Sequence, residues 1–160
     1  MGKLLVKQKV LSFRDRFYVT DEFGETRYYA EGAIFSLGKK CAIYDNQGRE
    51  AARIEQRVWS WLPTFLIWIQ DVQVASIQKK WGFLRPRYHV DFGDIEVKGD
   101  MWGLHYQLIS KGNVVGSINK KLFKLADTYE IEVLDDQLEV MVLALVLSID
   151  FVMAMEQSSA

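Results

Sequence analysis

The side chains best suited to proton transfer or metal binding occur in one stretch of the chain. His89 and Asp91 would share one face of a strand, and Asp94 and His105 follow them. Imidazole and carboxylate groups can bind a metal ion or act as an acid–base pair. The two histidines lack the tight or helical spacing of metal ligands, and no Gly-rich phosphate loop joins a strand to a helix. We predict no catalytic residue, no metal and no cofactor, and therefore no enzyme.

Two other reactive arrangements are also disfavoured. Cys41 falls in an expected strand, where we interpret it as a small hydrophobic residue and not as a nucleophile. Glu139 and Asp150 would lie about 16 Å apart along a helix. Catalytic carboxylate pairs need about 5 to 9.5 Å. Because Cys41 is the only cysteine, an internal disulfide is excluded, and a reducing, cytoplasmic location is expected.

Basic residues gather where strands are expected to end, and in one place they alternate with Trp81 and Phe83. Such a patch can bind phosphate while the rings enter an interface. The alternative is a solvated strand edge that its charges protect from pairing. Lys39 and Lys40 leave the same two alternatives open. The candidate ligand-binding residues are Lys79, Lys80, Arg85, Arg87, Lys120 and Lys121.

Three tryptophans, Trp59, Trp61 and Trp68, stand close together in the segment VWSWLPTFLIWIQ. They could form an interfacial anchor or a surface that binds a partner. The segment also contains Phe65, Ile67 and Ile69, which alternate as in a half-buried strand. This alternation favours core packing and a hairpin corner for the tryptophans.

The composition suits one globular domain over residues 1–160. The chain is 49% hydrophobic and 26% charged, which is compatible with a sizeable core. Its formal net charge of −1 does not favour nucleic acid as a partner. The first ten residues match neither a signal peptide nor a myristoylation motif, so no export signal or lipid anchor is expected.

Short runs rich in β-branched and aromatic residues predict a β protein of about ten to twelve strands. No helical period is sustained between Leu4 and Val133. Turn signals separate the runs. They occur at Asp21–Gly24, Asp45–Gly48, Phe92–Asp94, Lys98–Asp100 and Lys111–Asn113.

A weak repeat occurs in three of the predicted strands. Each copy consists of a small residue, a polar residue, isoleucine, two polar residues and a basic residue. In a strand the small residue and the isoleucine share one face, while the final basic residue points to the other. A small inward residue would let the strand backbone approach something bulky. The copies are Ala52–Arg57, Ala75–Lys80 and Gly116–Lys121.

The bulky element is predicted to be a helix over about residues 136–155. Its uninterrupted apolar part, Val140–Ile149, is ten residues or about 15 Å long, which is half of the hydrocarbon thickness of a bilayer. We therefore predict no transmembrane segment. Asp136 and Glu139 fit a capping box with Asp136 as the N-cap. A helix that is apolar on all sides and has a capped start is expected in the core, with Glu139 and Asp150 near the two mouths of a barrel.

The segment from Gly32 to Phe65 resembles the LURP-one-related family. The similarity consists of a lysine-containing strand, an Asp-x-x-Gly hairpin, a strand ending in basic residues and a Ser-x-x-Pro stretch. The order of elements and the late apolar helix extend the resemblance to most of the chain. It implies a tubby-like fold, which is a closed antiparallel β-barrel of about twelve strands around a buried C-terminal helix.

The resemblance also implies a non-enzymatic binding module. Tubby proteins bind phosphoinositide head groups and scramblases act at membranes, so an anionic phospholipid at the cytoplasmic membrane surface is the expected ligand. The alternative is a structural module that binds a protein partner or another copy of itself. Under the first reading the protein would be cytoplasmic and peripheral at the membrane.

Overall fold

The computed structural model describes residues 2–8, 16–35, 38–57, 61–62, 64–80, 87–100, 105–123 and 126–158, and at some element ends it describes the backbone alone. Twelve strands precede a short 3-10 turn, η1, and one long helix, α1. The strands are β1 (Gly2–Gln8), β2 (Arg16–Asp21), β3 (Thr26–Phe35), β4 (Gly38–Asp45), β5 (Glu50–Arg57), β6 (Thr64–Ile69), β7 (Val72–Lys80), β8 (Arg87–Asp91), β9 (Ile95–Asp100), β10 (His105–Ser110), β11 (Asn113–Phe123) and β12 (Ala126–Val133); η1 covers Asp136–Leu138 and α1 covers Glu139–Ser158.

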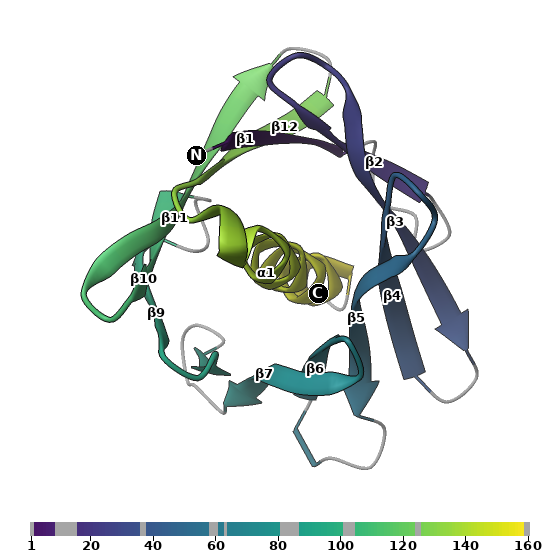
Figure 1. Cartoon of the computed structure of the whole chain (residues 1–160). Coiled ribbons are helices and arrows are strands. Elements are labelled where there is room, and N and C mark those ends of the chain that lie inside the picture. Colours follow the sequence, from purple (N-terminus) through teal and green to yellow (C-terminus); the bar gives the residue numbers. More distant parts are fainter. Residues whose placement is uncertain are drawn as a thin grey trace.

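All twelve strands belong to one antiparallel sheet that curls around α1 (Figure 1). The order is β8-β7-β6-β5-β4-β3-β2-β1-β12-β11-β10-β9, so sequence neighbours pair throughout and β1 also pairs with β12. The sheet ends at β8 and β9, which follow each other in the chain. Among the described residues, the pairing between these two strands is the bridge of Phe92 with Ile95. The predicted mainly β fold with one C-terminal helix is confirmed, whereas closure into a barrel by hydrogen bonds stays a prediction.

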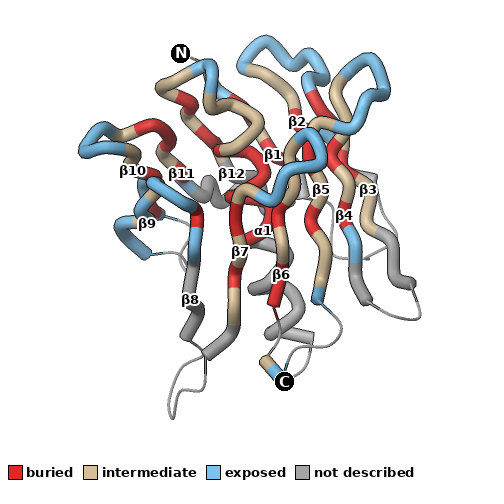
Figure 2. The backbone as a smooth tube through the Cα atoms, turned by 60° about the horizontal axis from the view of Figure 1, so that its bottom comes forward, coloured by how far each residue is buried: buried red, intermediate tan, exposed pale blue. Residues whose placement is uncertain are grey.

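The core lies between the inner face of the sheet and α1. Residues Val142–Ile149 of the helix are buried on all sides, as predicted for a helix enclosed by strands. Figure 2 shows that the buried positions follow the strands lengthwise, while the hairpins are exposed. Within the part of the chain that the structure describes, no helix is both long and apolar enough to cross a bilayer.

The repeated strands face α1 as their sequences predict. Ala52, Ile54, Ala75 and Ile77 are all buried, with at most 5% of their surface exposed. In the third copy, a Cβ atom added to Gly116 would lie 2.9 Å from Val142 Cγ1 of α1. The strand backbone therefore approaches the helix more closely than any larger residue would allow.

The start of the helix differs from the prediction. The N-cap is Asp135, not Asp136; it caps the 3-10 turn η1 that leads into α1, and its side chain accepts a hydrogen bond from the Gln137 backbone N–H at 3.1 Å. Glu139 does not complete a capping box in the described contacts, because its carboxylate accepts hydrogen bonds from Tyr28 and Arg27 of β3. The helix also continues beyond residue 155, to Ser158.

Two of the predicted turns share one local geometry. Asp21 Oδ1 accepts hydrogen bonds from the backbone N–H groups of Phe23 and Glu25, each at 2.9 Å. Asp45 Oδ1 accepts the equivalent bonds from Gln47 and Arg49, also at 2.9 Å. Each side chain replaces a backbone acceptor, as aspartate does in Asx turns.

The predicted turn at Lys98–Asp100 is wrong, because these residues belong to β9. Gly99 serves a close strand contact instead: its φ is +120°, and a Cβ atom there would lie 2.6 Å from the carbonyl oxygen of His105. The turn between β6 and β7 was not predicted. It consists of Gln70 and Asp71, which both adopt positive φ without a glycine.

Candidate functional site

The antiparallel order gives the curled sheet two chemically different ends. Five short turns lie at one end together with the start of α1; we call this the hairpin end (Figure 2). The odd-numbered strands all run away from it and finish at the opposite end. Their final segments bring Arg57, Lys79–Lys80 and Lys120–Lys121 to that end, although the three strands are far apart in the sequence. We call this the basic end.

The candidate ligand-binding residues can be placed by backbone only. Lys79 and Lys80 are the last residues of β7, and Lys80 stands opposite Arg87, the first residue of β8. Lys120 and Lys121 lie in β11, opposite Tyr129 and Thr128 of β12. The side chains of these five basic residues, and the whole of Arg85, lie outside what the structure describes. Strand direction thus brings the predicted residues to one end, and their side-chain contacts stay a prediction.

Trp61 adds an exposed aromatic ring to the basic end. It lies between the end of β5 and the start of β6, and it is fully exposed, at 101% of the reference surface. Core packing and a hairpin corner were the favoured prediction; core packing is wrong for this residue, whereas its place between two paired strands agrees with a corner. Arg57 is also exposed, while Lys40 at the start of β4 forms an ion pair of 3.7 Å with Glu55. An aromatic ring and cations therefore face solvent in the same region.

Trp68 lies on the outer face of β6, under Arg53, and not in the core. The Arg53 guanidinium carbon lies 5.7 Å from the centre of the Trp68 ring. Arg53 Nη1 is 2.9 Å from Glu50 Oε1, and Arg53 Nε is 2.7 Å from Glu55 Oε1, an ion pair whose angles do not suit a hydrogen bond. Phe65 and Ile67 occupy the inner face as predicted. Trp59 lies outside the described residues.

A row of tyrosines crosses the outer face of three neighbouring strands. Tyr18 of β2 stands opposite Tyr29 of β3, which in turn stands opposite Tyr44 of β4. The rings of Tyr29 and Tyr44 stack with their centres 5.1 Å apart. Tyr18 is 49% exposed. These rings lie outside the core. They form an aromatic surface to which a partner could bind.

Polar contacts at the hairpin end hold the helix in place. Glu139 Oε1 accepts hydrogen bonds from Tyr28 Oη at 2.6 Å and from Arg27 Nη2 at 3.0 Å. Burial and the neighbouring Glu139 carboxylate raise the pKa of Tyr28 well above its usual value.

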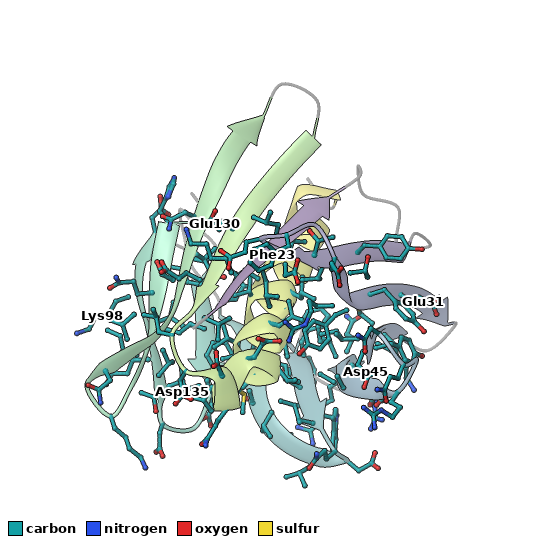
Figure 3. All side chains as sticks on the ribbon, turned by 45° about the horizontal axis from the view of Figure 1, so that its top comes forward. Phe23, Glu31, Asp45, Lys98, Glu130 and Asp135 are labelled. Atoms are coloured by element: carbon teal, nitrogen blue, oxygen red, sulfur yellow. The ribbon has the colours of Figure 1, made fainter. Side chains whose placement is uncertain are left out.

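Other charged residues are distributed around the molecule (Figure 3). Asp135 lies where β12 leads into the helix, and Glu31 and Lys98 point away from the helix on different sides of the molecule.

The residues considered for chemistry do not form one site in the described structure. Asp91 Oδ1 accepts a 3.1 Å hydrogen bond from the Gly93 backbone N–H, so it supports the β8–β9 turn. His105 begins β10 at the other end of the sheet, 3.4 Å from Asn119 Oδ1. The side chain of His89 lies outside the described residues. In the parts that are described, no three His, Cys, Asp or Glu side chains are grouped to hold a metal ion.

Cys41 is buried on the inner face of β4. Burial raises the pKa of its thiol to about 12, so the thiolate that would act as a nucleophile is scarce near neutral pH. Its position agrees with the interpretation of Cys41 as a small hydrophobic residue.

Comparison with known proteins gives a family and a fold. The model of the LURP-one-related family matches residues 3–150. The uncharacterized protein YxjI of Bacillus subtilis (strain 168) is 31% identical over 153 residues, which cover 96% of this chain and 94% of that protein. An X-ray structure of an Arabidopsis thaliana protein aligns with a TM-score of 0.60 at 12% identity, over 93% of this chain and 91% of that one. The Arabidopsis similarity concerns the fold alone.

Proposed function

Starting from the fact that this chain belongs to the LURP-one-related family, we propose that it is a non-enzymatic, tubby-like module that binds anionic phospholipid head groups through its basic end. In this proposal the sheet closes as a barrel, and the protein is cytoplasmic and peripheral at the membrane. The observation that carries the proposal is the position of Trp61, which is fully exposed at the same end of the sheet as the basic ends of β5, β7 and β11.

The charges support this orientation. Each Lys or Arg near an anionic membrane surface contributes about 1 kcal/mol to the free energy of binding. A tryptophan places its ring at the level of the lipid head groups. Arg57 and Trp61 are both exposed at the basic end. The hairpin end has the opposite character, because acidic residues predominate in its turns. These include Asp21, Glu22, Glu25, Asp71 and Asp94. An anionic membrane would repel this end and attract the other.

Vesicle sedimentation tests the proposal. We expect binding to phosphatidylglycerol vesicles that weakens from low to high salt, and little binding to phosphatidylcholine vesicles. Reversing two charges with Lys79→Glu and Lys80→Glu should weaken binding by at least about tenfold. The matched control reverses Arg49 and Lys111, which are exposed in the β4–β5 and β10–β11 turns at the hairpin end, and should bind as the natural chain does.

A second pair of variants tests the aromatic contribution. Trp61→Ala should weaken vesicle binding, whereas Phe23→Ala should not, because Phe23 is 84% exposed but lies in the β2–β3 turn at the hairpin end. Binding that is independent of salt, or equally sensitive to both charge reversals, would contradict the proposal.

The tyrosine row on β2, β3 and β4 supports a second candidate function, a module that binds a protein partner or another copy of itself. Tyr18 is the most accessible member of the row, at 49% exposed. Light scattering over a range of protein concentrations tests self-association. If the row forms the contact, Tyr18→Ser should shift the protein toward the monomer. A natural chain that is monomeric at every concentration would exclude self-association.

A further inference from the structure

A cavity lies at the hairpin end, where the two edges of the sheet meet the start of the helix. Its volume is about 570 Å³, and it lies between the β8–β9 turn, the β10–β11 turn and η1. Small-molecule sites typically have volumes of about 300 to 1,000 Å³. The cavity is therefore large enough for a small organic ligand, and it is at the opposite end from the basic surface.

The inner wall of the cavity is apolar. Phe92 and Val115 are almost fully buried, and the other apolar residues are partly buried side chains that pack against the core. These side chains separate the cavity from the core between the sheet and the helix. The additional apolar lining residues are Val74, Ile95, Leu138 and Met141.

The rim of the cavity is polar and carries more negative than positive charge. Asp94 and Lys111 are exposed on the two turns, and Asp135 lies beside the helix start. In the described part of the molecule, neither Asp94 nor Lys111 has an ion pair. Two carboxylates thus face one ammonium group around the opening.

We propose that this cavity binds a small amphiphile with an apolar body and a protonated amine. The apolar body would contact Phe92, Val115 and Met141, and the amine would lie at the rim near Asp94 and Asp135. An amine bound between carboxylates forms charge-assisted hydrogen bonds. This site is separate from the proposed lipid surface, so either proposal can fail without the other.

The helix start does not favour an anion here. A helix N-terminus ordinarily attracts negative charge because its first N–H groups lack partners. In this protein the Asp135 carboxylate already occupies that position and accepts the Gln137 N–H. An added anion would meet this carboxylate and that of Asp94, and among the described residues that line the cavity Lys111 is the one cation to offset them. The rim therefore selects for a cation.

Titration of the 160-residue chain with 2-phenylethylamine, followed by amide NMR shifts, tests the proposal. We expect saturable shifts at Gly93, Lys111 and Gln137. The neutral analogue 2-phenylethanol should bind about tenfold more weakly, and the anionic 3-phenylpropionate more weakly still. Saturation only elsewhere, no saturation at these amides, or tighter binding of the carboxylate would overturn the proposal.

Two variants separate charge from cavity shape. Asp94→Asn should weaken amine binding by about tenfold, while the control Glu22→Gln, an exposed residue of the β2–β3 turn, should leave it unchanged. Val74→Phe should remove binding by filling the apolar wall. The dispersion of the NMR spectrum shows whether the Val74→Phe variant is folded. If it is not folded, the amine affinity of Asp94→Asn alone tests the site. Amine binding that is unchanged in Asp94→Asn would contradict the assigned role of the rim.

Discussion

The Tyr28 hydroxyl donates a 2.6 Å hydrogen bond to Glu139 Oε1, which links β3 to the first residue of the C-terminal helix. The two residues are 111 positions apart in the sequence. Arg27 donates a second bond to the same oxygen at 3.0 Å, but its side chain is 45% exposed. Because solvent screens an exposed pair, the tyrosine contributes more to holding the helix at this mouth of the sheet.

Removing this hydroxyl should destabilise the protein. Tyr28→Phe is expected to lower the free energy of unfolding by about 1.5 to 3 kcal/mol, since the lost bond has a charged acceptor that is largely buried. Chemical denaturation measures the change. The control Tyr18→Phe, at a half-exposed ring on the outer face, should change it by less than about 0.5 kcal/mol. Equal effects in both variants would refute the link.

Gly116 should tolerate no side chain. Gly116→Ala places a Cβ 2.9 Å from Val142 Cγ1, and overpacking of this kind costs about 1 to 3 kcal/mol. Combining it with Val142→Ala removes the clash, so the double variant should be more stable than the sum of the single effects implies. Gly2→Ala is the control, because nothing lies within 4 Å of the added atom. Additive effects in the denaturation cycle would rule out this contact.

Cys41 should resist alkylation in the folded protein. Its pKa is raised to about 12 by burial, and only the thiolate reacts quickly. We expect iodoacetamide to modify it slowly at about pH 8, and rapidly after denaturant exposes the thiol at an ordinary pKa of about 8.5. Mass spectrometry over time follows the reaction. Comparable rates in the two conditions would show that the thiol is accessible in the native state.

Asp45 should stabilise the fold in a pH-dependent way. The backbone N–H of Arg49 is the main cause that lowers the pKa of Asp45, with the Arg49 side chain and the Gln47 N–H also contributing. The pKa of Asp45 is lower in the folded state than in the unfolded state. Its ionised carboxylate therefore stabilises the fold fully above the unfolded pKa of about 3.9, and this stabilisation is lost as the pH falls through the folded pKa.

The comparison of Asp45→Ala with the natural chain tests this dependence. The two should differ in stability at about pH 7 and converge toward about pH 2. Denaturation at several pH values measures the difference, with Glu22→Ala as an exposed control. A difference that stays constant with pH would show that the Asp45 charge is not involved.

Local rules in the sequence determined most of the elements. Aspartate and glycine predicted the turns after β2 and β4 because their preferences act within four residues. The inward alternation of Ala52 and Ile54 predicted a buried face because strand geometry has a period of two. The apolar stretch after Asp136 predicted an enclosed helix from its length and uniform hydrophobicity.

Tertiary structure decided the features that depend on distant partners. Glu139 binds Tyr28 and not its own helix start, because β3 presents a stronger donor there. Gly99 serves a close strand contact in place of a turn, since its neighbour Tyr106 comes from another strand. Trp61 is exposed in the β5–β6 connection, although Phe65 and Ile67 of the same apolar segment are buried in β6.

The candidate surfaces have the same origin. In the sequence alone, the basic strand ends at Arg57, Lys80 and Lys121 are separate features, and strand direction brings them to one end of the sheet. The cavity likewise needs both edges of the sheet and the helix start to meet. By itself, the sequence determined which elements form, because those choices rest on neighbouring residues. Only the folded sheet decided which elements meet, because that depends on contacts between residues far apart in the chain.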